Sequence, residues 1–544
     1  MTPAASSSML RGLDQPAFIS LVPEPVGSAD GPLGGVQIAV KDNIDVAGLP
    51  TTAACPARDQ PAAATAPAVQ RLVGAGAVVI GKTNMDQFAT GLVGTRTPYG
   101  ACHSVASTAH ISGGSSSGSA VAVAAGIVPL ALGTDTAGSG RVPAAFNGLV
   151  GFKPTRGLVP TTGVLPACPS LDCVTTLTRD VALARTAFEV MIGVDAGDPY
   201  SRPMPVALPS GVAQRMQVLA VPDGDLDLDD AHRVAWDAAL EHAAKVAHLV
   251  PVPIGSFLEA AKLLYTSALV AERFDAFGAQ LETDGPHLDP TVRRIVLAGR
   301  EHPAAAVFAA QRRLAALRAE AMQAFVGADA LLLPVTPGHP RLAEVADDPI
   351  GVNTRLGTYT NMVNLFDLCA VAVPAGQRPD GLPFGVQLIA PAFADRPLLD
   401  LAERWTGGDG APVRTDGALL AVAGAHLSGQ PANGQLVALG GRLHSRTRTA
   451  GGYRMYRVPG PFPRPGLVAD TTGPAAGLEV EVWELPQHGV GQLLESIAPP
   501  LGLGQVQLAD GGRVTGFVAA GPPDATAEIT GYGGWRGYLA SIEG

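Results

Sequence analysis

The stretch GGSSSGSAVAVAAGIVPLALGTDTAGSGRVPAAFNGLVGFK, residues 113–153, decides how this chain folds and where its chemistry lies. Its centre reads as an Ala-rich helix over 119–126 followed by a strand over 128–135, and a loop rich in glycine and serine flanks each end. Ser115 comes just before the helix and Ser139 just after the strand. With one helix and one strand between them, the two loops can come together at one edge of the sheet, although the serines are far apart in sequence.

Two serines alone make a poor nucleophile, because a serine hydroxyl needs a nearby base to take its proton. No histidine is placed by any pattern to act in a Ser–His–Asp scheme. The candidate base is Lys41, at the end of the apolar run VQIAV (36–40). Burial disfavours the charged form of lysine and lowers its pKa from ~10.4. A neutral lysine can accept a proton, and a second serine can relay it.

The loop TDTAGSG (134–140) supplies the other need of acyl transfer, which is a set of donors for a developing oxyanion. Its small residues let the backbone approach a substrate closely. We expect the oxyanion hole to be formed by the backbone N–H groups of Thr136, Ala137, Gly138 and Ser139.

Outward from this stretch, apolar runs alternate with segments of helical periodicity, which predicts an α/β domain around a mainly parallel or mixed sheet. Further strands are expected at 36–40, 77–81, 331–338 and 369–376, and further helices at 66–76, 231–249 and 301–325.

The composition changes near residue 405, where GGDGAPVRTDG reads as a linker. We therefore expect a catalytic domain over 1–405, a linker over 406–418 and a smaller α+β domain over 419–544. The last segment alternates apolar and polar residues, as in LEVEVWELP (478–486), and is predicted to consist mainly of strands.

Bulk properties exclude several classes of protein. Hydrophobic residues make up 47% of the 544 residues and charged ones 16%, which allows a large core and argues against disorder. The net charge of -11 disfavours binding to nucleic acid. No apolar run approaches the ~20 residues of a membrane span. The five cysteines are an odd number and lack metal-ligand spacing, and no signal peptide is visible. We therefore expect a reduced, cytoplasmic protein. We expect it to need neither a metal nor an organic cofactor.

Three segments resemble the amidase signature family: VKDNIDVAG (40–48), GGSSSGS (113–119) and GTDTAGSGRVPAAFNGLVGFKPT (133–155). The resemblance covers roughly 30–400 and implies a mixed central sheet covered by helices. It implies that Ser139 is the acylating nucleophile, that Ser115, held at a cis peptide bond, bridges to it, and that Lys41 is the base. Asp135 and Arg141 match a supporting ion pair. The chain departs from the usual pattern at Ser117 and Ala137, which replace glycines.

Within the family, the chain is most similar to the branch that hydrolyses allophanate, a urea that carries a carboxylate. Tyr265 and Arg273, in LYTSALVAERF (264–274), match residues that bind substrate there, and a spacing of eight residues places both on one face of a helix.

The segments GAHLSGQPANGQL (424–436) and LEVEVWELP resemble the accessory domain of that branch, which is related in fold to γ-glutamyl cyclotransferases. That domain is thought to decarboxylate the first product, and His426 is the leading candidate for this role, ahead of His488 and Glu481. The resemblance also implies a homodimer and a functional link to a separate urea carboxylase.

Two other interpretations of function stay open at this point. One is a different amidase of the same family, acting on biuret, an aryl amide or a glutamine amide. The other is a catalytically silent subunit that binds a partner.

Two further motif matches are rejected. GAVVIGKT (76–83) fits a phosphate-binding loop, but a strand-like AVVI fills the pattern. GSSSG (114–118) fits a nucleophile elbow, but no clear strand precedes it.

Overall fold

The structure is a computed structural model that describes residues 15–543, apart from residues 24, 26–27, 206–215, 283–284, 409–416, 440, 459–463 and 521–526. The chain divides into two compact units. The first takes in the described residues of Met1–Met204 and Gln214–Gly410, and the second those of Pro205–Ala213 and Ala411–Gly544. Most of the linker predicted over 406–418 lies outside the described residues. Each unit has a sheet and a hydrophobic core of its own.

The first unit is built on an 11-stranded sheet in the order β1-β3-β2-β6-β8-β7-β12-β13-β11-β9-β10. β2 pairs in parallel with β3 and β6, and β9 pairs in parallel with β10 and β11, whereas the pairs from β6 through β13 are antiparallel. The sheet is therefore mixed, as predicted. Its strands are β1 (Phe18–Leu21), β2 (Gln37–Lys41), β3 (Val78–Thr83), β6 (Leu130–Asp135), β7 (Val150–Lys153), β8 (Cys173–Thr178), β9 (Val218–Pro222), β10 (His248–Val252), β11 (Ala330–Pro334), β12 (Leu368–Gln377) and β13 (Pro383–Pro391).

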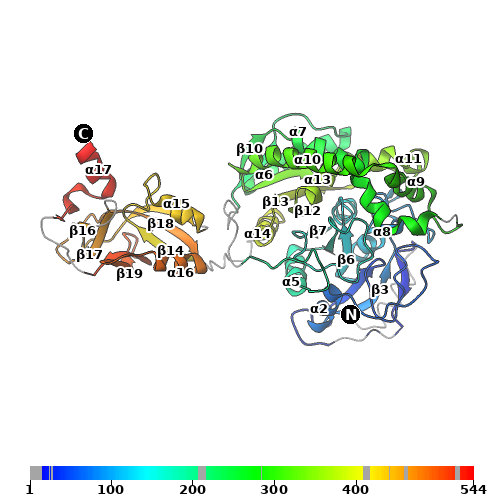
Figure 1. The fold of residues 1–544 in the computed structure, drawn as a ribbon, viewed down its shortest axis with the longest axis horizontal. Helices are drawn as coiled ribbons and strands as arrows, with labels where there is room; N and C mark the ends of the chain where they lie inside the picture. The colour runs from blue at the N-terminus through cyan, green and yellow to red at the C-terminus, as the bar shows by residue number, and fades with distance from the viewer. Residues whose placement is uncertain are drawn as a thin grey trace. The chain divides into compact units, whose positions relative to one another are not determined.

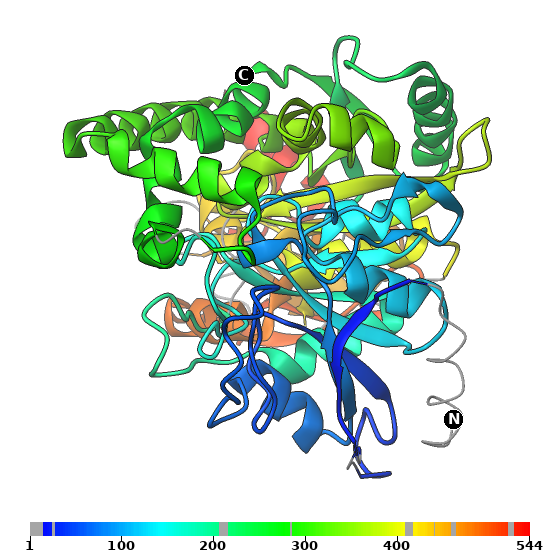
Figure 2. The same cartoon turned by 90° about the vertical axis from the view of Figure 1, so that its right-hand side faces the viewer.

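Helices cover both faces of this sheet. α2 (Pro67–Gly74), α5 (Val181–Met191), α14 (Asp395–Trp405) and α6 (Asp230–Val246) pack on one face and against one another in succession, and Figure 1 shows the first three along the left-hand side of the strands. On the other face lie α3 (Ser117–Ala124), α4 (Arg141–Phe146), α13 (Asn361–Leu365), α7 (Gly255–Thr266) and α10 (Ala304–Ala321). Figure 2 shows the green helices gathered at one end of this unit and the blue N-terminal strands at the other.

Small residues explain why α3 can lie deep in the molecule. The helix reads SGSAVAVA, and its first seven residues are buried. A β-carbon added at Gly118 would approach the carbonyl oxygen of Ala17 to 2.2 Å, so the helix packs directly on neighbouring backbone. This close packing sets α3 against the segments that precede β1 and follow β3, while the Ser116 hydroxyl donates to the carbonyl oxygen of Thr134 near the end of β6 over 3.2 Å.

The second unit contains a seven-stranded sheet in the order β15-β18-β14-β20-β17-β16, with β19 paired to β20. The unit is rich in strands, as expected from its alternating sequence. Its elements are β14 (Gly417–Val422), α15 (Asn433–Ala438), β15 (Arg442–Arg448), β16 (Tyr453–Val458), β17 (Arg464–Ala469), β18 (Glu479–Pro486), α16 (Gln487–Glu495), β19 (Leu501–Gln507), β20 (Arg513–Ala519) and α17 (Trp535–Glu543).

Two further findings bear on the bulk predictions. All five cysteines are buried and unbridged. Among the helices that the structure describes, none is both long and apolar enough to cross a membrane.

Candidate active site

The two glycine- and serine-rich loops meet, as the sequence predicted. The backbone N–H of Ser116 donates a hydrogen bond to the carbonyl oxygen of Ser139 over 3.2 Å. The hydroxyl of Ser139 lies 3.4 Å from the carbonyl oxygen of Gly91, and its residue is only 2% exposed. Gly138 has a φ of +125°, and a β-carbon there would come within 2.4 Å of Thr360 Oγ1. Only glycine fits this turn, because both the backbone angle and the space exclude a side chain.

Lys41 and Ser115 form the centre of the site. Lys41 Nζ lies 2.8 Å from Ser115 Oγ and 2.7 Å from Thr134 Oγ1, and all three side chains are buried. The peptide bond between Gly114 and Ser115 is cis, as the family resemblance implied. β2 ends at Lys41 and pairs with β6, which contains Thr134, so the parallel strands deliver the lysine and its partners to one edge of the sheet.

The surroundings of Lys41 make the neutral amine accessible near neutral pH. Burial lowers the pKa of Lys41 to about 7, although the nearby carboxylates of Asp86, Asp172 and Asp135 raise it. A neutral amine has two N–H groups and one lone pair. The hydroxyl and the carbonyl oxygen of Thr134 lie 2.7 and 3.5 Å from Nζ and can accept both N–H groups. The lone pair then faces Ser115, which is the geometry that a general base needs.

The four backbone N–H groups predicted to form the oxyanion hole differ in their hydrogen bonding. The N–H of Gly138 donates to Asp135 Oδ1 over 2.7 Å, so it is already used within the loop. The N–H groups of Thr136, Ala137 and Ser139 make no hydrogen bond to any residue that the structure describes. All four residues stay the proposed oxyanion hole, with the N–H groups of Thr136, Ala137 and Ser139 unengaged and that of Gly138 bonded within the loop.

The ion pair expected between Asp135 and Arg141 is present and fully buried. Arg141 Nε lies 2.9 Å from Asp135 Oδ2, and Arg141 also donates to Gln387, to Asn364 and to the carbonyl oxygen of Thr360. Although burial raises the pKa of Asp135, the charge of Arg141 outweighs this and holds that pKa below its usual value. The Asp135 carboxylate accepts the N–H groups of Gly138 and Gly140, so the pair fixes the shape of the loop 136–140, which holds the proposed nucleophile Ser139 and is called the nucleophile loop below.

Tyr265 and Arg273 are brought together, but not on one helix as predicted. Tyr265 lies in α7, whereas Arg273 lies in α8 (Ala271–Glu282). Ser267 ends α7 in an extended conformation, and its side chain accepts the N–H of Leu269, so the chain bends between the two helices. The bend still aims both side chains at one point, with Arg273 Nη2 3.2 Å from the Tyr265 hydroxyl.

Arg273 lies beside the nucleophile loop. Its Nη1 lies 3.2 Å from Thr90 Oγ1, and Thr90 precedes Gly91, whose carbonyl oxygen contacts the Ser139 hydroxyl. The residue is 1% exposed, and its buried Nε has no hydrogen-bonding partner among the described residues. Tyr265 packs against the apolar cluster that contains Ala137. A buried guanidinium with unused N–H groups is suited to bind a carboxylate on two oxygens.

Sequence reasoning missed two residues of this site. Thr134 was quoted within the motif but given no role, although the pattern places it one residue before Asp135. Asp172 was not singled out. It accepts hydrogen bonds from the Thr136 hydroxyl and from the backbone N–H groups of Ala167 and Cys168. Burial raises the pKa of Asp172 to about 6. No pattern within the sequence signals that this distant carboxylate supports the oxyanion loop.

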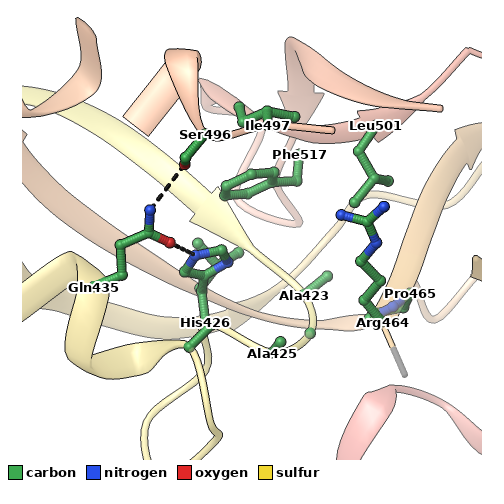
Figure 3. Close-up of a pocket in the computed structure, with 13 residues that line it drawn as sticks. Ala423, Ala425, His426, Gln435, Arg464, Pro465, Ser496, Ile497, Leu501 and Phe517 are labelled. Carbon is green, nitrogen blue, oxygen red and sulfur yellow. Dashed lines mark hydrogen bonds between the residues drawn. The ribbon is translucent and has the colours of Figure 1, made fainter. Parts of the chain in front are cut away.

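His426, the leading candidate in the second unit, lines a pocket of about 90 Å³. Figure 3 shows its ring beside Phe517 and across from Arg464, with Ile497 and Leu501 closing the apolar side. The rings of His426 and Phe517 are stacked, with centroids 4.9 Å apart. His426 Nε2 lies 2.9 Å from Gln435 Oε1, and burial lowers the pKa of the histidine.

The two weaker candidates differ. Glu481 is fully buried in an ion-pair network and is not among the residues that line the His426 pocket. Its carboxylate accepts hydrogen bonds from Ser428, Trp483, Arg446 and Arg536. It therefore holds the loop that follows His426. The side chain of His488 lies outside the described residues. In the described part of the chain, no group of three or more His, Cys, Asp or Glu side chains is placed to hold a metal ion.

Comparison with known proteins places these two units in context. The Amidase family profile matches residues 22–399, and the profile of the allophanate hydrolase C-terminal domain matches residues 418–540. The urea amidolyase of Lachancea kluyveri is 41% identical over 577 residues, which cover 97% of this chain and 31% of that protein. This chain thus spans less than a third of the length of that relative. The A subunit of the glutamyl-tRNA(Gln) amidotransferase of Haloarcula marismortui is 35% identical over 69% of this chain and 95% of that protein.

Solved structures agree with the sequence relatives. The allophanate hydrolase of Kluyveromyces lactis matches with a TM-score of 0.76 and 39% identity, over 100% of this chain and 97% of that chain. The first profile covers the sheet and loops that carry Lys41, Ser115 and Ser139, and the second covers the unit that carries His426.

Proposed function

The chain belongs to the amidase family, and from this premise we propose that it hydrolyses allophanate through a seryl acyl-enzyme formed on Ser139. The observation that carries the proposal is the buried hydrogen bond of 2.8 Å between Lys41 and Ser115, beside the loop that holds Ser139. The buried guanidinium of Arg273 supports a substrate that bears a carboxylate.

The first step is acylation. Neutral Lys41 takes the proton of the Ser115 hydroxyl while Ser115 takes that of Ser139. Ser139 Oγ forms a bond to the terminal carboxamide carbon of allophanate, and the carbonyl oxygen becomes an oxyanion held by the proposed N–H donors. The carbon–nitrogen bond then breaks, and the relay returns a proton to the leaving nitrogen, which departs as ammonia. Preorganised donors of this kind supply a large share of the barrier reduction.

Substrate orientation comes from Arg273 and Tyr265. The allophanate carboxylate lies at the far end of the molecule from the carboxamide carbon. Arg273 contacts Thr90, and the carbonyl oxygen of the next residue, Gly91, contacts the hydroxyl of Ser139. Binding the carboxylate there places the carboxamide carbon at Ser139. The positioning of a reactant against a catalytic group accelerates a reaction strongly, because the entropic cost is met on binding.

The second step releases the product. Water attacks the acyl-enzyme carbonyl with Ser115 and Lys41 as the relay, the ester bond to Ser139 breaks, and Ser139 regains its proton. The product is a carbamate that carries a second carboxylate on its nitrogen. We propose that it is decarboxylated in the His426 pocket. The bond from nitrogen to one carboxylate carbon breaks, carbon dioxide leaves, and the nitrogen keeps the electron pair and takes one proton from water. The remaining carbamate decomposes to ammonia and carbon dioxide.

The test is ammonia release by the purified chain from allophanate, with biuret and a simple neutral amide in parallel. We expect a strong preference for allophanate, and we expect Ser139→Ala to abolish turnover while the fold is kept. Preference for a neutral amide would keep the Lys41–Ser115–Ser139 chemistry and reject the substrate. Ammonia release that persists in Ser139→Ala would reject the nucleophile.

Supply of the substrate and assembly of the protein are further parts of the proposal. We propose that a carboxylase acting on urea provides its allophanate, because two of the relatives that this chain matches are urea amidolyases. A homodimer in the cytoplasm is proposed from the family resemblance. Size-exclusion chromatography with light scattering would test the dimer.

A further inference from the structure

The hydrogen-bond chain behind His426 determines which nitrogen of its ring carries the proton. The Ser496 hydroxyl lies 2.7 Å from the carbonyl oxygen of Leu493. A carbonyl oxygen can only accept, so the single hydrogen of this hydroxyl is used there. Ser496 Oγ must then accept from its other neighbour, which is the side-chain amide of Gln435 at 2.8 Å. The amide therefore turns its NH₂ group to Ser496.

The same amide turns its oxygen to the histidine. Gln435 Oε1 lies 2.9 Å from His426 Nε2, and an amide oxygen can only accept a hydrogen bond. His426 Nε2 must carry a hydrogen. In the neutral ring the lone pair then lies on Nδ1. Figure 3 shows this second nitrogen turned away from Gln435, on the side of the pocket where Arg464 lies.

We propose that Gln435 and Ser496 are positioning residues that lock His426 as the Nε2–H tautomer, so that Nδ1 accepts a hydrogen bond from an N–H group of a small ligand whose carboxylate Arg464 binds. This inference rests on the proposed function and specifies how the second pocket recognises its ligand. Nδ1 makes no hydrogen bond to any described residue, so it is available to a ligand. Arg464 lines the same pocket and donates from Nη2 to the carbonyl oxygen of Pro499 over 3.4 Å.

The arrangement matches the doubly carboxylated nitrogen of the amidase product. That molecule presents one N–H donor between two carboxylates, and the pocket presents one acceptor near one cation. The opposite tautomer would place an N–H of the ring against the N–H of the ligand. The stacked ring of Phe517 holds the imidazole plane, so the histidine cannot easily turn to exchange its nitrogens.

The experiment uses the full chain with ¹⁵N-labelled histidine. The ¹⁵N shifts separate a protonated ring nitrogen from one with a lone pair, and a His426→Asn variant assigns the signals. We expect a protonated Nε2 in the wild type and in Gln435→Glu, because a carboxylate also only accepts. We expect a mixture of tautomers in Gln435→Leu and in Ser496→Ala, because each loses one link of the chain. Gln492→Leu, an exposed change in α16, is the matched control and should leave the tautomer unchanged.

Ligand recognition is tested with oxamate and pyruvate, which have the same size and carboxylate but differ in carrying an N–H group or a methyl group. We expect the wild type to bind oxamate about threefold to tenfold more tightly, the worth of one neutral hydrogen bond, and Gln435→Leu to lose this preference. A wild type with its lone pair on Nε2, unchanged tautomers in both Gln435→Leu and Ser496→Ala, or equal binding of the two ligands would each overturn the proposal. Failure of the wild type to release ammonia from allophanate would reject the proposed function and leave the tautomer result intact.

Discussion

Replacing Arg273 with glutamine tests the substrate assignment most sharply. A guanidinium has five N–H donors. Two of them are used by Thr90 and by Tyr265, which leaves Nε and one hydrogen on each Nη for a ligand. A carboxylate held by two of these donors makes charge-assisted hydrogen bonds, each worth about 1.5–3 kcal/mol. Because such contributions do not add fully, we expect Arg273→Gln to cost about 2–4 kcal/mol in transition-state binding of allophanate.

This loss corresponds to a fall of roughly 30-fold to 900-fold in kcat/KM for allophanate. Biuret has the same reacting carboxamide but no charge at its far end, so its kcat/KM should fall by only about threefold to tenfold, since no ion pair with a carboxylate is lost. Coupled measurement of ammonia release gives both constants, and Arg294→Gln, an exposed change in α9 (Pro290–Ala298), serves as the control. Thermal unfolding of each variant separates lost folding from lost binding. If both substrates lose activity equally in folded Arg273→Gln, the arginine supports the fold and does not bind the carboxylate.

Three other predictions rest on the same geometry. Because burial lowers the pKa of Lys41 to about 7 and the neutral form is the base, kcat/KM for allophanate should rise about tenfold between roughly pH 6 and pH 8; a profile flat over that range would reject Lys41 as the titrating base. Asp135→Asn leaves Arg141 buried without its partner and should lower the free energy of unfolding by about 3–5 kcal/mol in urea titrations, whereas Glu189→Gln, in the exposed pair with Arg396, should change it by less than about 1 kcal/mol. Gly138→Ala should reduce turnover by at least about tenfold, because its β-carbon would clash with Thr360 and because the positive φ at this position disfavours alanine. The control Gly434→Ala, where the β-carbon has open space, should leave turnover unchanged. Full activity in Gly138→Ala would show that the loop tolerates a shift.

The sequence predicted the fold well where local patterns decide it. Short apolar runs bounded by glycine predicted β2, β3 and β6 within a few residues, and the small residues of α3 indicated a buried helix. The bend between Tyr265 and Arg273 was missed, because helical spacing was extended through Ser267, which leaves the helix and caps the next turn. Serine competes with the helical backbone for hydrogen bonds, and this sequence gives no further sign of a break there.

The site residues that lie in local sequence motifs were predicted, whereas those that depend on tertiary contacts were not. Lys41, Ser115 and Ser139 lie in motifs whose order along the chain already implies a shared sheet edge. Asp172 contributes through a contact with Thr136 that depends on the antiparallel pairing of β6 and β8. The hydrogen bond from the Gly138 N–H to Asp135 could not be predicted, because the sequence does not show which N–H groups the loop itself uses. Tertiary hydrogen bonds decide such questions, and they are not encoded in spacing.

The carboxylates around Lys41 help to set the pKa that its proposed role as the base requires. Burial alone would lower its pKa much further, and three buried carboxylates alone would keep it protonated. Each carboxylate has its own partners: Asp135 has Arg141, Asp86 accepts the N–H groups of Gly94 and Arg96, and Asp172 accepts those of Ala167 and Cys168. These partners weaken the effect by which the carboxylates raise the pKa of Lys41. Together with burial, which lowers it, this leaves the pKa at about 7. A change that removes the partner of one carboxylate should therefore raise the pKa of Lys41 and shift the activity profile to higher pH, even though the lysine itself is untouched.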